Sequence, residues 1–262
     1  MNASKRTVAT LVAAGALVVV ALLLLRLGDD RAESGVSAGP PSDEGPTATS
    51  LFASKLDDTT VPVNILIVGD DTGKSVGGWV TLVAQDLGIA HSRAVDVRDW
   101  DLATGSGYLP PVRMWDAPGE PLTVWNVSVA RNVDFLLGAL PNAVPPTPTD
   151  VDAVVVNTGT VQAPETLARE TVSLARAAES RVNPERTIVV VQPVSDSTNA
   201  GATERSRVDV ETSARKNGFE VADVRSAFDS ANTGPLFEPG SIYPDVEGAR
   251  VWASTVVDAA TS

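Results

Sequence analysis

The feature that most constrains the fold of this chain is an apolar run followed by a glycine-rich turn and a helical pattern. Residues 63–68 are mostly β-branched and end at Gly69, which predicts a buried strand. Gly73 and the glycines after it allow a tight turn, and the apolar residues of 79–87 recur at helical spacing. This order places the turn at the carboxyl edge of a parallel sheet, where open α/β folds bind ligands. The turn after Gly69 is therefore the first candidate site.

Strand and helix patterns alternate through the rest of the chain, which predicts an α/β fold with a doubly wound parallel sheet. The segment 99–121 has no clear element, but its tryptophans, tyrosine and prolines suggest an ordered loop. Such a loop is either functional or caps the sheet with its aromatic side chains. The expected strands are 63–68, 94–97, 122–125, 152–156 and 187–191, and the expected helices are 79–87, 133–140, 165–180, 203–217 and 246–259.

The turn after the first strand and the segment after residue 122 carry a family resemblance. Gly69-Asp70-Asp71 resembles the first block of the SGNH/GDSL hydrolase superfamily, Gly-Asp-Ser, with Asp71 at the position of the nucleophilic serine. Residues 122–137 resemble the second block, in which the backbone N–H of a glycine helps to form the oxyanion hole. Arg131 stands at that glycine position.

Two later segments extend the resemblance. The apolar residues 153–157 lead into 158–162, where the family has Gly-x-Asn-Asp, so its asparagine falls on Val161 and its aspartate on Gln162. Residues 239–253 are similar to the last block, Asp-x-x-His-Pro followed by a glycine and the final helix. Gly240 replaces that aspartate and Tyr243 replaces the histidine.

Together the four segments cover about residues 62–260 in the family's order. The resemblance implies a flavodoxin-like three-layer sandwich with a parallel sheet, in a degenerate member whose catalytic residues are replaced. It implies no cofactor, and a role in recognition or scaffolding with a glycan or acylated ligand of the cell envelope. The ligand-binding positions that it implies are Asp70, Asp71, Thr72, Asn126, Arg131, Gly159, Thr160 and Tyr243.

The residues themselves argue against ordinary serine esterase chemistry. Acyl transfer through a serine needs a base for the nucleophile and donors for the oxyanion. The chain has one histidine, His91, which follows the first helix and is expected to lie far from Asp71. The alternative is an active esterase or acetyl hydrolase with a non-standard catalytic set. It would need a serine with a proton acceptor at the carboxyl edge, and the candidates are Ser75, Ser106 and Ser128.

Two other readings of the first turn remain open. Asp71 could itself be a nucleophile, since carboxylates form covalent intermediates. Residues 69–75 also resemble a phosphate-binding loop, but they are one residue too short to close its cradle of backbone N–H groups.

The replacement of two site positions by charged residues suggests how the site is filled. We expect Asp71 and Arg131 to form a charge-assisted pair, with the hydroxyl of Tyr243 as a third member. In the alternative, Arg131 points into water and Asp71 caps the helix that begins at Trp79.

Composition limits the partners. The net charge of −13 and the pI of about 4.5 argue against nucleic acid, because no basic face is available. No cysteine is present, so a metal would depend on carboxylates, which suit Mg²⁺ or Ca²⁺, and no metal site is expected. The sequence predicts no particular oligomeric state.

The N-terminus predicts attachment to a membrane. Lys5 and Arg6 precede an uncharged run over residues 8–25, which is about long enough to span hydrocarbon. We expect residues 1–27 to form a cytoplasmic tail and an uncleaved signal anchor that contacts the membrane through 8–27, although 36–38 could serve as a cleavage site. Residues 28–60 then form a flexible stalk, and 61–262 an extracytoplasmic domain at the cell membrane.

Overall fold

The first strand predicted from the sequence lies inside a seven-stranded sheet. In this computed structural model the described residues are 51–74, 77–145, 151–195, 203–231 and 235–262, all within one unit that spans Ala48–Ser262. The strand order is β3-β2-β4-β1-β5-β6-β7, and only β3 is antiparallel to its neighbour. The strands are β1 Val63–Gly69, β2 Val95–Asp99, β3 Val112–Trp115, β4 Leu122–Ser128, β5 Ala153–Asn157, β6 Arg186–Val190 and β7 Glu220–Ala222.

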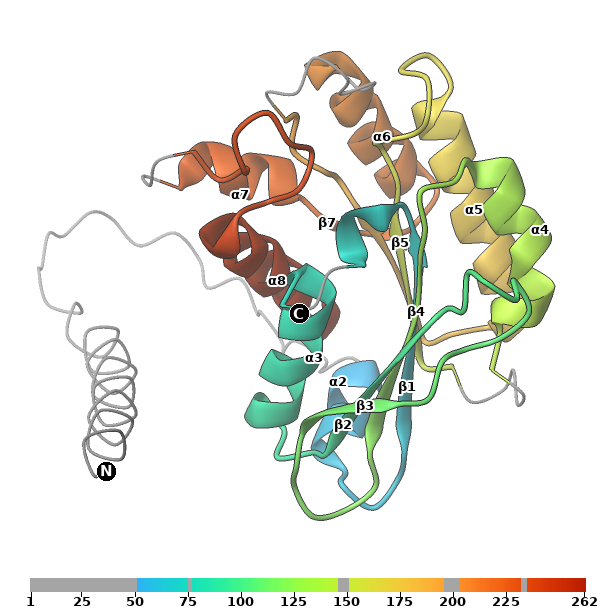
Figure 1. Ribbon diagram of the computed structural model, residues 1–262, viewed down its shortest axis with the longest axis vertical. Coiled ribbons are helices and arrows are strands. Elements are labelled where there is room, and N and C mark those ends of the chain that lie inside the picture. The colour runs from blue at the N-terminus through green and yellow to red at the C-terminus, as the bar shows by residue number, and fades with distance from the viewer. Residues whose placement is uncertain (1–50, 75–76, 146–150, 196–202, 232–234) are drawn as a thin grey trace, which may run out of the picture. The chain divides into compact units, whose positions relative to one another are not determined.

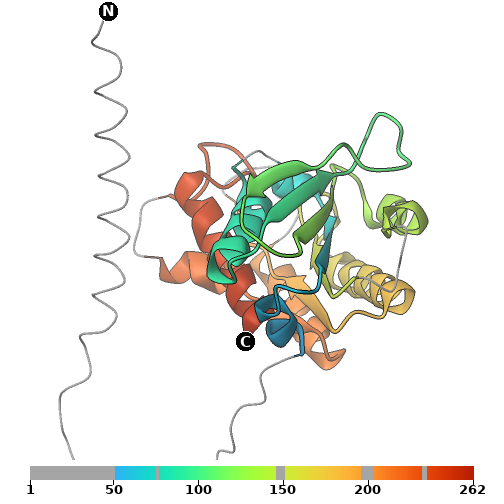
Figure 2. The ribbon, with the colours of Figure 1, turned by 90° about the horizontal axis from the view of Figure 1, so that it is seen from below.

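Helices cover both faces of the sheet, as Figures 1 and 2 show. One buried cluster joins α2, α3, α7 and α8 to the sheet, and a second joins α4, α5 and α6 to its other face. The described helices are α2 Leu51–Asp57, α3 Trp79–Ala90, α4 Val133–Ala143, α5 Leu167–Val182, α6 Glu204–Lys216, α7 Val224–Ser230 and α8 Val246–Thr261, with a 3₁₀ turn, η1, over Asp71–Gly73.

This arrangement confirms the predicted α/β three-layer sandwich. The strands β4-β1-β5-β6-β7 alone have the doubly wound, flavodoxin-like order, while β2 and β3 extend the sheet beyond β4. In β1, Ile65 and Ile67 face one buried cluster, and Leu66 and Val68 face the other. Both faces of the strand are therefore apolar, as expected for a parallel strand that is covered on each side.

Apart from α2, three elements were not predicted from the sequence. Strand β3 is short and lies among prolines, and β7 and α7 have little apolar periodicity. The segment 99–121 is ordered, and the side chains of Trp100 and Tyr108 pack against the core, as the sheet-capping alternative describes.

The expected stalk is wrong at its C-terminal end. Residues 51–57, assigned to the stalk 28–60, form α2, which buries Phe52 and Leu56 against the sheet. These side chains are four positions apart, so they occupy one face of the helix. Residues 58–60 form the turn after α2, while the expected anchor and residues 28–50 of the stalk lie outside the described residues. No helix in the described ranges is long and apolar enough to cross a membrane.

A buried arginine fastens α2 to the sheet. Arg93 is completely buried, and its guanidinium donates to five backbone carbonyl groups. The acceptors belong to the end of α2, to the turn that follows it and to the segment before β4: Lys55, Leu56, Asp58, Val61 and Glu120. Lys55 also pairs with Asp152 just before β5. The segment before β1 is thus held at the amino edge of the sheet.

Stacked tryptophans join α3 and α8. The rings of Trp79 on α3 and Trp252 on α8 are nearly parallel, with centroids 5.7 Å apart. The side chain of Asp245 caps α8 by accepting from the N–H of Gly248 at 2.8 Å. These contacts fix the start of α8, and with it the loop that brings Tyr243 toward η1.

Candidate functional site at the carboxyl edge

The candidate site lies where β1 and β5 end, between strands whose connections run to opposite faces of the sheet. Doubly wound folds bind ligands at this switch point. Gly69 allows the two strand ends to approach, because a Cβ there would lie 1.8 Å from the carbonyl oxygen of Asn157. The N–H of Asp70 donates to the same oxygen at 2.8 Å. The turn after β1 therefore lies directly against the loop after β5.

Asp70 is the centre of a buried polar network. Its side chain is inaccessible to solvent and accepts five hydrogen bonds from neighbouring groups. The donors are the N–H and hydroxyl of Thr72, the side-chain amides of Asn157 and Gln192, and the N–H of Thr160. Burial raises the pKa of Asp70, and these hydrogen bonds oppose the rise. Five donors around one carboxylate hold the loops after β1, β5 and β6 together.

The same donors leave Asp70 and Thr72 little freedom to bind a ligand. Thr72 is buried, and its hydroxyl also accepts from Asn157 at 2.9 Å. In the phosphate-loop reading, backbone N–H groups of this turn would face a phosphate. Instead the N–H of Thr72 donates to Asp70, and that of Lys74 donates to the carbonyl of Asp71.

A second buried charge lies on the other side of the loop after β5. Arg207 of α6 is 3% exposed, and its terminal nitrogens donate to the carbonyls of Thr158 and Gly159 at 3.4 Å. No carboxylate of the described residues forms an ion pair with it. Burial lowers the pKa of Arg207 to about 10, although Asp70 and Glu204 favour its charged form. Gly159 makes room for it, since a Cβ there would lie 1.7 Å from a guanidinium nitrogen.

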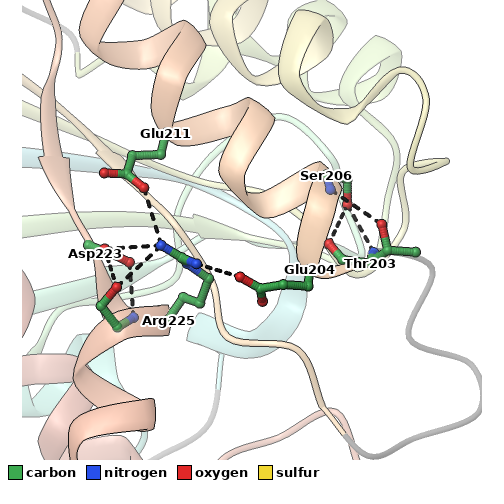
Figure 3. A network of polar contacts seen from close by, with 7 residues as sticks. Thr203, Glu204, Ser206, Glu211, Asp223 and Arg225 are labelled. Carbon is green, nitrogen blue, oxygen red and sulfur yellow. Dashed lines mark hydrogen bonds and ion pairs between the residues drawn. The ribbon is translucent and has the colours of Figure 1, made fainter.

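A polar cluster fixes the start of α6 (Figure 3). The side chains and backbones of Thr203 and Ser206 form a capping box. Arg225 of α7 pairs with Glu204, with Glu211 at 3.3 Å and with Asp223 at 3.5 Å. Because Arg207 lies in the same first turns of α6, this cluster also limits where its guanidinium can lie.

Asp71 accepts a hydrogen bond from Tyr243, the two residues that the resemblance predicts at the positions of the nucleophile and the histidine. The hydroxyl of Tyr243 lies 2.5 Å from a carboxylate oxygen of Asp71. This bond raises the pKa of Tyr243 to about 12, because loss of the phenolic proton would place two negative charges together. The expected contact between these two residues, 172 positions apart, is confirmed.

The expected pairing of Asp71 with Arg131 is wrong. Among the described residues no ion pair joins them, and the guanidinium of Arg131 lies 5.8 Å from the ring centre of Phe135. Arg131 occupies an exposed turn after β4, where its N–H donates to the carbonyl of Val129. The turn directs this side chain along α4. Asp71 does not cap α3 either, since Gly78 precedes that helix without a side-chain cap.

The other positions that the resemblance implies differ in burial and in hydrogen bonding. Asn126 is buried and bonded to Gly73, Asp99 and Ser128, so it supports the turn. Val161 is 44% exposed, and the buried amide of Gln162 has no partner among the described residues. Gly240 has a φ of 70° in a turn before Tyr243.

Among the described residues, His91 forms no nucleophile–base pair with a candidate serine. His91 ends α3 and pairs with Asp57 at 2.7 Å, at the amino edge. Ser128 is buried and donates to Asn126, and Ser106 is exposed in the segment after β2. Ser75 lies outside the described residues.

A narrow pocket opens beside this network. Four of its lining residues each have a buried side-chain atom without a hydrogen-bond partner in the described structure, and all four atoms can donate. Its enclosed space of about 10 Å³ has room for roughly one water-sized group. The atoms are Thr160 Oγ1, Ser195 Oγ, Arg207 Nε and Trp252 Nε1. This pocket can therefore accept one oxygen atom of a ligand at its inner end.

Sequence reasoning missed Asn157, Gln192, Ser195 and Arg207. Asn157 and Gln192 each stand at the end of an apolar run, and a polar residue at that position could have been predicted to lie at the carboxyl edge. Arg207 carried none, because it is one of several arginines on a polar helix. Within the described residues no group of three or more His, Asp or Glu residues could hold a metal ion.

Solved structures with this fold include hydrolases. A lipolytic protein of the G-D-S-L family from Veillonella parvula aligns with a TM-score of 0.53 and 14% identity, covering 75% of this chain and 97% of its own. A mutant of an acetyl-xylooligosaccharide esterase from Geobacillus aligns at 0.54 and 12%, covering 76% and 94%. An α/β hydrolase from the metagenome of Lake Arreo, Spain, gives 0.53 and 14%, with the same coverage.

No family model and no curated protein matches the chain in sequence. The structural likeness therefore shows the fold alone: an α/β fold like that of SGNH/GDSL hydrolases. The predicted resemblance is confirmed at this level.

Proposed function

We propose that this chain is a membrane-anchored, extracytoplasmic SGNH-hydrolase-like protein that binds a ligand of the cell envelope and does not hydrolyse esters through a serine. The observation that carries this proposal is the Tyr243–Asp71 hydrogen bond of 2.5 Å. In the alignment that the resemblance implies, Asp71 and Tyr243 stand at two catalytic positions, and they cannot act as a serine–histidine pair.

The chemistry of the edge supports binding over hydrolysis. A serine nucleophile needs a base within hydrogen-bond reach. Among the described residues, the one imidazole is at the opposite edge, and Ser128 gives its proton to an amide oxygen. Tyr243 has a raised pKa and stays protonated at neutral pH, so it makes a poor base.

The unpartnered donors of the narrow pocket supply a means of recognition. A carbonyl or hydroxyl oxygen entering the pocket would satisfy groups that are otherwise buried without partners. Glycans and acylated glycans carry such oxygens. The apolar side chains of Phe237 and Ile242, which also line the pocket, would contact the carbon atoms beside that oxygen.

The second candidate function is an esterase or acetyl hydrolase with a non-standard catalytic set. Ser195 favours it, because its buried hydroxyl lies in the loop after β6 without a partner. Asp71 as a nucleophile is less favoured, since its carboxylate already accepts from Tyr243.

Two measurements on the purified full chain test the proposal. Short-chain nitrophenyl esters and acetylated xylo-oligosaccharides should not be hydrolysed above background. Acetylated xylo-oligosaccharides or peptidoglycan fragments should bind saturably, and Ser195→Ala and Thr160→Val should each weaken binding. Ser128→Ala is the matched control, because its hydroxyl lies outside the pocket. Turnover that Ser195→Ala abolishes and Ser128→Ala preserves would establish the esterase instead.

A further inference from the structure

A second hollow, away from the carboxyl edge, contains an arginine without a charged partner. Its volume is about 420 Å³, within the range of about 300–1,000 Å³ of small-molecule sites. It lies beside α4, over strands β2 and β4, and is separate from the narrow pocket. Its lining residues include Arg98, Ser106, Tyr108, Trp125 and Asn142.

The wall of this hollow is an aromatic cluster in a fixed arrangement. Trp125 donates from its indole N–H to Asn64 at 3.0 Å, and the ring of Tyr108 meets it edge-on with centroids 4.9 Å apart. The hydroxyl of Tyr108 donates to the carbonyl of Ala143 at the end of α4. Trp100 meets the other side of Tyr108, with centroids 5.3 Å apart. The hydrogen bonds of Trp125 to Asn64 and of Tyr108 to Ala143 hold both rings in place without a ligand.

The rim of the hollow is ordered by Asp101. The carboxylate of this residue accepts from the N–H of Ala103 and the hydroxyl of Thr104, both at 2.9 Å. The N–H of Asp101 donates to the carbonyl of Gly107 at 2.9 Å, which closes a short turn. Ser106 is thereby held at the mouth of the hollow.

Arg98 supplies the only charge among the lining residues of this hollow. Its guanidinium lies over the Trp125 ring, with Cζ 5.1 Å from the ring centre, because the two residues are partners in the β2–β4 register. Among the described residues it forms no ion pair and donates no hydrogen bond. A guanidinium held over an aromatic ring has its donors available for a bidentate contact with a carboxylate.

We infer that this hollow binds an acidic sugar, with the carboxylate on Arg98. The side chains of Asn142 and Ser106 offer hydrogen bonds to hydroxyl groups, and the rings of Tyr108 and Trp125 offer apolar contact to the carbon skeleton. A neutral sugar would leave Arg98 unpaired. A larger ligand such as a nucleotide would find no second cation in the lining. This site is independent of the binding proposed at the carboxyl edge.

The test is calorimetric titration of the full chain with glucuronate, and with glucose in parallel. Glucuronate should bind saturably, and glucose at least about tenfold more weakly, since a hydrogen bond to a charged group contributes about that factor or more. Arg98→Gln should weaken glucuronate binding about tenfold or more. Asn142→Ala should weaken it by a smaller factor.

Arg113→Gln is the matched control because it removes the same charge from the neighbouring β3. Arg113 is exposed and already pairs with Asp96 at 2.7 Å and with Asp116 at 2.8 Å. It should leave glucuronate binding unchanged, and circular dichroism should show both variants folded. Absence of saturable binding, equal affinity for glucose, or a folded Arg98→Gln variant with unchanged affinity would each overturn the inference.

Discussion

The two edges of the sheet each contain a buried charge with five hydrogen bonds, but the partners differ in kind. At the amino edge, Arg93 donates only to backbone carbonyls. At the carboxyl edge, Asp70 accepts mostly from side chains: Thr72, Asn157 and Gln192. Backbone acceptors depend on the path of the chain, whereas side-chain donors require particular residues. The comparison suggests that the amino edge is structural and that the carboxyl edge retains the layout of a site.

The largest expected effect is on the amino edge. Arg93→Met should lower the free energy of unfolding by about 3–4 kcal/mol, because it leaves several buried carbonyls without donors. Urea denaturation of the full chain, followed by circular dichroism, measures this loss. Arg113→Met removes an exposed, ion-paired arginine and should change stability by less than about 1 kcal/mol. If both variants lost the same free energy of unfolding, the structural role proposed for Arg93 would be wrong.

Disrupting the Asp70 network at the carboxyl edge should lower the free energy of unfolding by less than the Arg93 substitution does. Asp70→Asn should lower the free energy of unfolding by about 2–3 kcal/mol, because its new NH₂ group would face donors in place of acceptors. The same denaturation experiment compares it with Arg93→Met. Gln192→Glu should also destabilise, since it places a second carboxylate against Asp70. An Asp70→Asn protein as stable as the wild type would mean that the network does not hold these loops.

The Tyr243–Asp71 bond should be visible in a pH titration. The folded pKa of Tyr243, about 12, lies above its ordinary value of 10.0. The stability that the bond contributes is therefore present below pH 10 and is lost as the pH rises through about 12. Tyrosinate absorbance should show little ionisation near pH 10, and Asp71→Asn should move the first transition downward. Burial also raises the pKa of Tyr108, the other tyrosine, so Tyr243→Phe should remove the first transition. An Asp71→Asn curve identical to that of the wild type would contradict the bond.

The smallest expected effect is on activity. The double variant Asp71→Ser with Tyr243→His should not gain useful esterase activity. Gly240 offers no carboxylate to orient the new imidazole, and Val161 offers no side-chain donor to an oxyanion. Hydrolysis of nitrophenyl acetate, compared with the wild type, checks this. Robust turnover would mean that unrecognised groups supply both functions.

The sequence predicted much of the fold because the parallel strands β1 and β5 are apolar on both faces. The runs at β1 and β5 and the helical spacing of α3 and α5 were sufficient for the three layers. Strand β3 gave no such signal, since most of its residues are exposed. Helix α2 was missed because Phe52 and Leu56 form a short apolar face beside a long polar segment.

The candidate site was predictable only in part. The order of the family segments brought Asp71 and Tyr243 together correctly. The prediction for Arg131 was wrong because the sequence does not define the conformation of the turn after β4. That conformation decides whether the Arg131 side chain points toward Asp71 or along α4. Arg207 could not be predicted, since its contact with Gly159 depends on how α6 packs beside the loop after β5.

The attachment of α2 at the amino edge has a consequence for handling the protein. The carbonyls of Ala259 and Ser262 at the end of α8 accept from Arg186, the first residue of β6, at 2.7 and 2.6 Å. Both ends of the described domain therefore leave by the same edge, opposite the Tyr243–Asp71 bond. Immobilised through either end, the domain would present the carboxyl edge to the solution.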